Sequence, residues 1–262
     1  MPVSLEQILA TTERTLPALK ARRRELERLA ADRVPAASFR DAFDGPAIAL
    51  IAEVKRRSPS AGSIREDLDP ASRAAHYADG GAAAISVLTD GPHFGGSVAD
   101  LRSVAERVGV PVLRKDFILS EEQVLEARAA GASAVLLIVR ALAPARLASL
   151  CQFAADAGLA ALVEAHTAAE IATALDAGAV IVGINSRDLD TFRVDVLAAW
   201  RLFALVPRDI VAVAESGMAS VADVSLAAAA GADAVLIGTA LSAADDPHAL
   251  ARQLAGVRRL GR

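Results

Sequence analysis

Short apolar runs alternate with alanine-rich, partly charged stretches through most of this 262-residue chain. Five glycines mark the repeat, because each follows an alanine-rich stretch and precedes an apolar run of strand length: Gly81, Gly131, Gly158, Gly178 and Gly231. Two gaps of double length contain the further runs VLRKDF and IVAVAES. With the opening run IALIAEV, the pattern predicts eight strands spaced by roughly 20 to 30 residues, the size of a βα unit.

Eight successive βα units predict a parallel sheet covered by helices, and eight is the number of strands that closes as a barrel. An open doubly wound sheet is the alternative. It usually carries a GxGxxG or GxxxxGK[ST] nucleotide motif, and neither is present at the expected places. We therefore predict an α/β fold, a (β/α)8 TIM barrel that forms a single catalytic domain over residues 46–262.

Residues 1–45 lack this alternation and are predicted to form a helical extension that packs on the barrel. Ser4 and Gln7 have the spacing of a capping box at the start of a helix. Pro17 is predicted to end this first helix or to begin a second one. The basic run Arg22–Arg24 precedes two glutamates and is interpreted as a solvated helix face.

Composition limits the possible partners and location of the protein. The formal net charge of −4, with both signs mixed along the chain, argues against a nucleic-acid partner. No secretory signal and no apolar run of membrane-spanning length are visible, so we expect no membrane partner and a cytoplasmic location. The single cysteine, Cys151, is expected to be a packed thiol, and the scattered histidines predict no metal site.

Polar residues fall where the predicted strands end. Glu53 and Lys55 follow the first apolar run and, two residues apart, project to the same face of an extended strand. A buried acid and amine are costly unless they are paired or used. Further polar residues end the third, fifth, sixth and seventh strands: Lys115, Glu164, Asn185, Arg187, Glu215 and Ser216.

Each of these residues alone has an ordinary structural explanation. Their convergence on one rim does not, because the C-terminal rim of such a barrel is where chemistry takes place. His166 lies close to Glu164 in the sequence and is interpreted as structural, with a supporting role beside Glu164 as the alternative.

The last two predicted strands end in glycine-containing segments, SGMAS and IGTAL. Both are interpreted as places where a strand turns directly into a helix whose N-terminal N–H groups bind an anion. Gly217, Gly238 and Thr239 are therefore candidate phosphate contacts, and Ser58 in the first loop is expected to add a hydroxyl. The predicted ligand is a small phosphorylated molecule.

The chain closely resembles the indole-3-glycerol phosphate synthase family over essentially its whole length. Seven motifs in order carry the resemblance: IAEVKRRSPS at 51–60, SVLTD with FGGS at 86–97, VLRKDFI at 112–118, LVEAH at 162–166, GINSRDL at 183–189, AESG at 214–217 and IGTAL at 237–241. Ser186 departs from the family pattern, which usually has a second asparagine there.

The resemblance implies a carboxy-lyase of tryptophan biosynthesis that needs no cofactor or metal. It implies Lys115 as general acid, Glu164 as proton-transfer residue and Lys55 as a contact to the substrate carboxylate. Glu53 would orient the lysines, and the other implied site residues are those that position the substrate, bind its phosphate or line its aromatic ring: Asn185, Arg187, Glu215, Ser216, Ser58, Gly217, Gly238, Thr239, Phe94 and Phe117.

Two other functions stay open on the residues alone. Lys115 could form a Schiff base in an aldolase or synthase that acts on a phosphorylated sugar. The predicted phosphate loops could also belong to a non-catalytic barrel that binds a phosphorylated ligand. We expect a monomer or a weak homo-oligomer in each case.

Overall fold

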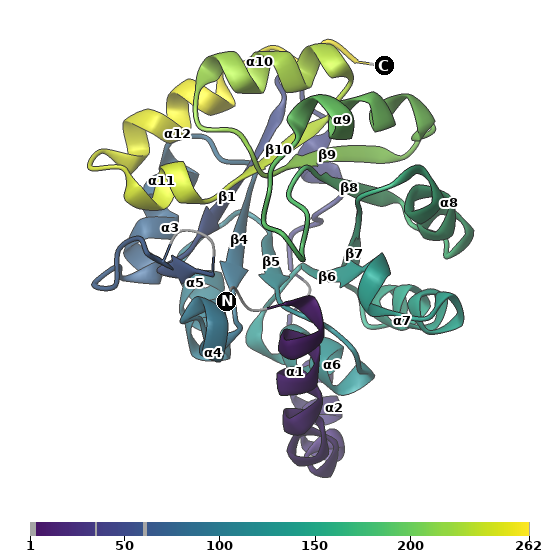
Figure 1. Ribbon diagram of the computed structural model, residues 1–262. Coiled ribbons are helices and arrows are strands. Elements are labelled where there is room, and N and C mark those ends of the chain that lie inside the picture. Colours follow the sequence, from purple (N-terminus) through teal and green to yellow (C-terminus); the bar gives the residue numbers. More distant parts are fainter. Residues whose placement is uncertain (1–3, 35, 60–61, 262) are drawn as a thin grey trace.

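Eight parallel strands close into a barrel in the computed structural model, which describes residues 4–34, 36–59 and 62–261 (Figure 1). The strands follow one another round the barrel in chain order, and the last pairs with the first. They are β1 (Ala49–Val54), β4 (Ala84–Leu88), β5 (Val112–Lys115), β6 (Ala134–Ile138), β7 (Ala160–Ala165), β8 (Ile181–Asn185), β9 (Val211–Glu215) and β10 (Ala234–Ile237). The predicted (β/α)8 TIM barrel is confirmed.

Side chains on each strand alternate between the barrel interior and the surrounding helices. On β1, Ala49 and Ile51 belong to the interior apolar cluster, whereas Leu50 and Ala52 pack with the outer helices. Glu53 occupies the next interior position. An apolar interior residue is followed two positions later by a charged one on three further strands: Leu113 and Lys115, Leu162 and Glu164, and Val213 and Glu215.

Helices surround the barrel on its outside (Figure 1). Alanine suits the buried face of these helices, because its small side chain lets a helix pack close to the strands. On α10, Ala227 and Ala228 are buried in this way. The helices that follow the strands are α3 (Pro70–Asp79), α4 (Gly91–Phe94), α5 (Val98–Arg107), α6 (Glu121–Ala130), α7 (Pro144–Asp156), α8 (Ala168–Asp176), α9 (Val196–Trp200), α10 (Val221–Ala230), α11 (Thr239–Ala243) and α12 (Pro247–Ala255).

Shorter elements complete the loops. Three 3-10 turns occur, η1 (Asp41–Phe43), η2 (Val139–Ala141) and η3 (Arg201–Leu205), and a small antiparallel pair, β2 (Arg57–Ser58) and β3 (Gly62–Ser63), forms in the loop after β1. The loop after β1 therefore contains backbone hydrogen bonds of its own, between β2 and β3.

The N-terminal segment is helical, with α1 (Leu5–Ala21) and α2 (Arg23–Ala31). The capping box is present: Ser4 N donates to Gln7 Oε1 at 3.0 Å, and Gln7 N donates to Ser4 Oγ at 3.3 Å. The prediction for Pro17 is wrong, because Pro17 lies inside α1 and the helices separate at Arg22. Pro17 is exposed, so water can hydrogen-bond the carbonyl that a proline leaves without a helical donor.

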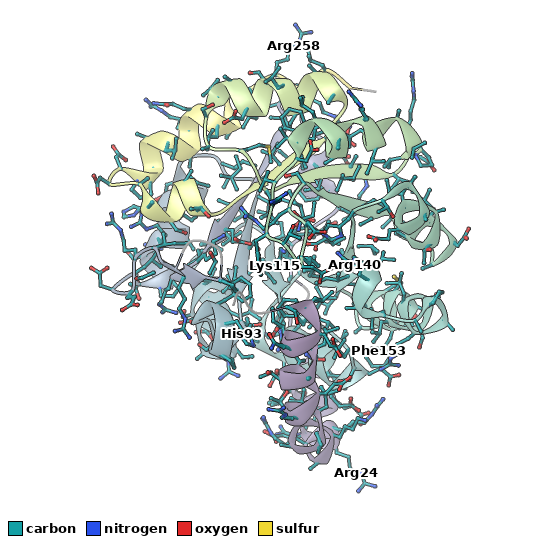
Figure 2. The ribbon with its side chains drawn as sticks, viewed as in Figure 1. Arg24, His93, Lys115, Arg140, Phe153 and Arg258 are labelled. Atoms are coloured by element: carbon teal, nitrogen blue, oxygen red, sulfur yellow. The ribbon has the colours of Figure 1, made fainter. Side chains whose placement is uncertain are left out.

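The solvated-face interpretation of Arg22–Arg24 is wrong for its middle residue. Arg23 Nη1 lies 2.8 Å from Glu121 Oε2 and 2.9 Å from Glu122 Oε1, so it joins α2 to α6. Arg24, the second residue of α2, projects away from the barrel (Figure 2). Phe39 and Phe43, which precede β1, belong to the interior apolar cluster and lie edge to face with ring centroids 5.0 Å apart.

Two further sequence expectations concern single features of this fold. Burial raises the pKa of the Cys151 thiol to about 11, as expected for a packed thiol. Over the described part of the chain, no helix is both long and apolar enough to cross a membrane.

Candidate active site

A cavity of about 500 Å3 opens where the barrel strands end. All fourteen residues predicted for the site line it: Glu53, Lys55, Ser58, Phe94, Lys115, Phe117, Glu164, Asn185, Arg187, Glu215, Ser216, Gly217, Gly238 and Thr239. They converge because side chains alternate along each strand, as described above. On β1, β5, β7 and β9, the last inward-facing side chain is charged and lies at the C-terminal end of the barrel.

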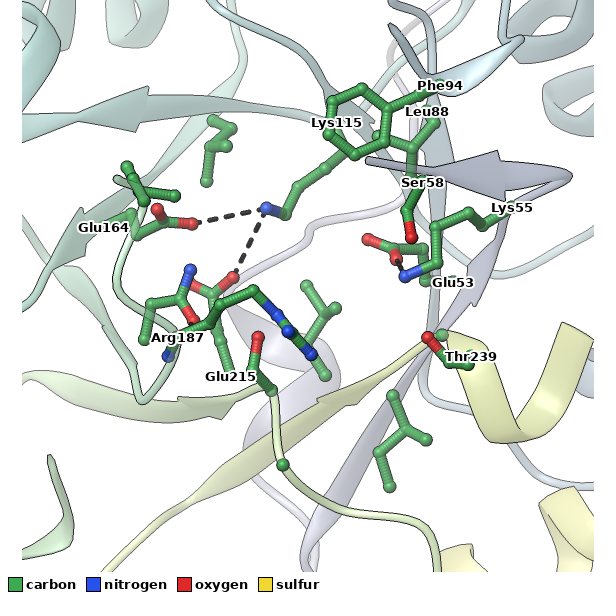
Figure 3. A pocket seen from close by; sticks show the side chains of 18 of the residues that line it. Glu53, Lys55, Ser58, Leu88, Phe94, Lys115, Glu164, Arg187, Glu215 and Thr239 are labelled. Carbon is green, nitrogen blue, oxygen red and sulfur yellow. Dashed lines mark hydrogen bonds and ion pairs between the residues drawn. The ribbon is translucent and has the colours of Figure 1, made fainter. Parts of the chain in front are cut away.

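Lys115 lies at the centre of the cavity, between two buried carboxylates (Figures 2 and 3). Its Nζ lies 3.3 Å from Glu164 Oε2 and 3.5 Å from Glu215 Oε2. The glutamate side chains are only 1% and 2% exposed. Burial lowers the pKa of Lys115, but the nearby carboxylates, led by Glu164, outweigh burial and raise it above its ordinary value.

The two carboxylates differ in their protonation. Burial raises the pKa of Glu215 to about 8, and the charge of the neighbouring Glu164 adds to the effect. Burial also disfavours ionised Glu164, but Lys115 and His166 outweigh it and lower the pKa of Glu164 below its ordinary value. At neutral pH the pair therefore holds one proton, mainly on Glu215, and Glu164 is the ionised partner.

Glu53 and Lys55 form a second pair on the opposite side of the cavity (Figure 3). Lys55 Nζ lies 2.9 Å from Glu53 Oε1, and both side chains are largely buried. Ser242 on α11 holds this strand end, since its Oγ accepts from Lys55 N at 3.1 Å and donates to Glu53 O at 3.2 Å. A Cβ on Gly238 would lie 2.3 Å from Glu53 Oε1, so this glycine leaves room for the ion pair.

The loop after β8 is held over the cavity by its own side chains. Asn185 Oδ1 accepts from Arg187 N at 3.0 Å, and Arg187 Nη1 donates to Phe192 O at 3.0 Å. Ser186, which departs from the family pattern, donates from Oγ to Glu215 O at 3.1 Å. This residue therefore ties the end of β8 to the end of β9.

Apolar side chains form one wall of the cavity. Phe94 and Phe117 lie with ring centroids 6.2 Å apart at an interplanar angle of 38°. Further apolar residues line the same cavity and were not predicted as site residues: Leu88, Leu189, Met218 and Leu236. The wall is suited to a planar aromatic group.

One of the two glycine loops differs from the prediction. Gly238 does directly precede α11, which begins at Thr239. Gly217 does not begin a helix, because α10 starts only at Val221 after Ser220 caps it. Ser216 and Gly217 instead both have left-handed backbone conformations, with φ of 66° and 77°, which turn the chain sharply after β9.

Gly183 was missed as a site residue. A Cβ at this position would lie 2.0 Å from Glu215 Oε1, so the glycine makes the space that the Glu215 carboxylate occupies. A glycine inside a strand often marks a place where another group comes close to the backbone. The glycine of the GIN segment at 183–185 was therefore a sequence signal for this site residue.

The closed parallel barrel, with a charged cavity at the C-terminal ends of its strands, defines an enzyme of the (β/α)8-barrel class. The family model described as indole-3-glycerol phosphate synthase matches residues 5–254. The chain belongs to this family, the carboxy-lyases of tryptophan biosynthesis, which confirms the membership predicted from its motifs.

Two relatives show how far the similarity extends. The chain is 50% identical over 234 residues to indole-3-glycerol phosphate synthase of Leifsonia xyli, covering 88% of this chain and 89% of that one. It is 45% identical over 256 residues to the protein of the same name from Desulfosudis oleivorans, covering 95% and 97%. The Schiff-base and binding-protein alternatives are not favoured by these matches.

Solved structures share the fold at lower sequence identity. The chain superposes on thiamine phosphate pyrophosphorylase from Pyrococcus furiosus with a TM-score of 0.61 and 18% identity, covering 79% of this chain and 93% of that one. It superposes on 3-hexulose-6-phosphate synthase with a TM-score of 0.62 and 18% identity, covering 79% and 98%. These similarities support the barrel alone.

Proposed function

We propose that this chain converts 1-(2-carboxyphenylamino)-1-deoxyribulose 5-phosphate to indole-3-glycerol phosphate, with Lys115 as the central acid. The position of Lys115 Nζ, within 3.5 Å of two buried carboxylates, carries the proposal. An ammonium group there stabilises a developing oxyanion in a site of low dielectric, and it can also donate a proton.

The reaction needs acid and base groups at different stages. The ring carbon that bears the carboxylate bonds to the C2′ carbonyl carbon, and the carbonyl oxygen takes a proton to become a hydroxyl. Loss of CO2 returns an electron pair to the ring. The hydroxyl then leaves as water with a second proton, and C1′ loses one proton to complete the indole.

Lys115 supplies the first proton in this proposal, at the carbonyl oxygen. Glu164, ionised at rest and adjacent, takes up one proton from outside the substrate and delivers it to the departing hydroxyl. It then removes the C1′ proton and passes it to Lys115, whose Nζ lies 3.3 Å away. Glu215 holds a proton at neutral pH and adds a hydrogen-bond donor beside Lys115.

Lys55 is placed in contact with the substrate carboxylate, with Glu53 fixing its ammonium group at 2.9 Å. Asn185 at the end of β8, Arg187 in the loop after it and Ser216 directly after β9 position the substrate in this proposal.

The two ends of the substrate have different environments in the cavity. Phe94 and Phe117 provide an apolar wall for the aromatic ring. The phosphate is assigned to the side formed by Ser58, Gly217, Gly238 and Thr239, where the first N–H groups of a short helix after the last strand favour an anion. In this proposal the sugar chain lies between these two sides of the cavity, beside Lys115.

The same proposal covers the organisation of the chain. Residues 46–262 act as a single catalytic domain, and residues 1–45 act as an accessory extension, supported by the Arg23 bridge to α6. The enzyme works in the cytoplasm as a monomer or weak homo-oligomer, without cofactor, metal or nucleic-acid partner.

Indole fluorescence after addition of the substrate, with EDTA present, tests the proposal. Product should form with wild-type protein, and Lys115→Ala should lower kcat by about 10³-fold or more. Lys20→Ala, on the exposed part of α1, is the matched control and should leave kcat unchanged. Absence of indole from folded wild-type protein would refute the assignment, and trapping of Lys115 by borohydride with a carbonyl substrate would favour a Schiff-base enzyme.

A further inference from the structure

Two buried polar atoms face each other behind the active site. His166 Nε2 lies 3.7 Å from Glu164 Oε1, and the side chains are 8% and 1% exposed. Within the described part of the chain, neither atom has another hydrogen-bond partner. A buried polar atom without a hydrogen-bond partner is energetically costly. We therefore infer that His166 Nε2 and Glu164 Oε1 move closer together when a proton lies between them.

The other edge of the imidazole is fixed by Glu170 at the start of α8. Glu170 Oε2 accepts from His166 N at 2.7 Å and lies 3.3 Å from His166 Nδ1. A carboxylate at this distance favours a proton on Nδ1, and the ring is thereby oriented with Nε2 toward Glu164. Glu170, His166 and Glu164 thus form a row that ends in the catalytic cavity.

Charged groups reach this row from the neighbouring elements. Arg140 in η2 faces it, and Arg140 is itself paired with Asp188 and Asp190 of the loop after β8 (Figure 2 shows Arg140 beside the barrel). Burial and Arg140 both lower the pKa of His166. The Glu170 hydrogen bond and the charge of Glu164 outweigh them, so this pKa lies above its ordinary value.

A second cavity, of about 660 Å3, is lined by His166, which does not line the main cavity. It lies between η2, α8 and the loop after β8, and His166, Glu170 and Arg140 line it. Asn185 lines both cavities. Solvent can therefore approach His166 while the substrate fills the main opening.

The proposed reaction requires a proton from outside the substrate. A substrate with an ionised carboxylate loses one negative charge as CO2 departs, while two protons enter at oxygen and one leaves from C1′. One proton must therefore be taken up in each turnover.

Resting on the proposed function, we propose that His166 is a positioning residue that supplies this proton to Glu164 and takes it from solvent in the second cavity. The Nε2–H bond of the imidazolium breaks, and an O–H bond forms at Glu164 Oε1. Glu164 passes this proton to the departing hydroxyl, and the proton that it then removes from C1′ goes to Lys115 Nζ, so both residues regain their starting protonation. The neutral ring keeps its Nδ1–H on Glu170. Because Nε2 is buried against Glu164, the ring must turn this atom toward the second cavity to recover a proton from solvent before the next turnover.

Two substitutions of His166 distinguish a role in proton transfer from a role in maintaining the shape of the site. His166→Ala should lower kcat between ~10-fold and ~100-fold at little change in KM, and added imidazole should restore it saturably. His166→Gln can still donate an N–H to Glu164 but cannot titrate, so kcat should stay low and lose part of its pH dependence. His248→Ala, on α12 outside both cavities, controls for loss of an imidazole.

The pH titration of the His166 ring, followed by NMR, gives a readout that does not depend on turnover. Its midpoint should fall in Glu164→Gln, because the carboxylate charge that favours the imidazolium is removed. A wild-type kcat and pH profile in His166→Gln would overturn the proposal, as would failure of imidazole to rescue folded His166→Ala. If wild-type protein forms no indole, the proposed function fails, and the NMR midpoint still tests the contact between His166 and Glu164.

Discussion

Replacement of Glu215 by glutamine tests whether the barrel holds a proton between its two central carboxylates. Glu215 is 2% exposed and its pKa is raised to about 8 from an ordinary value of 4.5, chiefly by burial. Glutamine has nearly the same shape as a protonated glutamate. We therefore expect Glu215→Gln to fold normally and to change how stability depends on pH.

The magnitude follows from proton linkage. Above pH 4.5 the unfolded chain releases the proton that folded Glu215 keeps up to about pH 8. The folded state binds more protons over this window, so the free energy of unfolding of the wild type falls as the pH rises, by about 1.4 kcal/mol per pH unit. The glutamine variant lacks this contribution and should gain about 3 kcal/mol relative to the wild type between pH 5.5 and pH 7.5.

Urea unfolding followed by circular dichroism at several pH values measures this difference. Glu13→Gln, on the exposed side of α1, is the control for loss of one carboxylate and should show no comparable pH-dependent gain. A constant difference between wild type and Glu215→Gln from pH 5.5 to pH 7.5 would refute the reasoning, because it would mean that folded Glu215 carries no trapped proton.

Two further substitutions test how this site is built. Gly183→Ala would place a Cβ 2.0 Å from Glu215 Oε1, so the carboxylate must move; kcat should fall about 10-fold to 100-fold, with a melting temperature close to that of the wild type. An unchanged kcat would show that the glycine is not needed. Arg114→Met removes a 4% exposed cation that lies 3.0 Å from Asp116 and 2.9 Å from Glu126, and it should cost about 3–5 kcal/mol in urea unfolding because the carboxylates lose their partner.

The fold could be predicted because its signals are local and repeated. Each strand is a short apolar run, and each unit is punctuated by a glycine, so the eight-stranded barrel followed from counting. The spacing of Glu53 and Lys55 also determined their common direction, since side chains two positions apart share a face of a strand. The 2.9 Å ion pair between them is the expected consequence.

The partners of Lys115 could not be predicted in the same way. Its distances to Glu164 and Glu215 depend on the stagger between strands that are remote in sequence, and Asn185 pairs in register with Glu215 only because β8 and β9 are aligned. The course of α1 through Pro17 was likewise decided by exposure. Sequence patterns contain no direct signal for either property.

The trapped proton also bears on how a cavity lined by four carboxylates, Glu53, Asp116, Glu164 and Glu215, can bind an anionic substrate. Asp116 is paired with Arg114 at 3.0 Å, so the other three carboxylates share the cavity with Lys55, Lys115 and Arg187. If all three were ionised, they would leave no net positive charge for a substrate that bears carboxylate and phosphate groups. With Glu215 protonated, the two lysines balance Glu53 and Glu164, and Arg187 leaves a net positive charge in the cavity. An incoming anion disfavours ionisation of Glu215 further. Substrate binding and retention of the proton therefore reinforce each other, and protonated Glu215 remains beside Lys115 when an anionic ligand is bound.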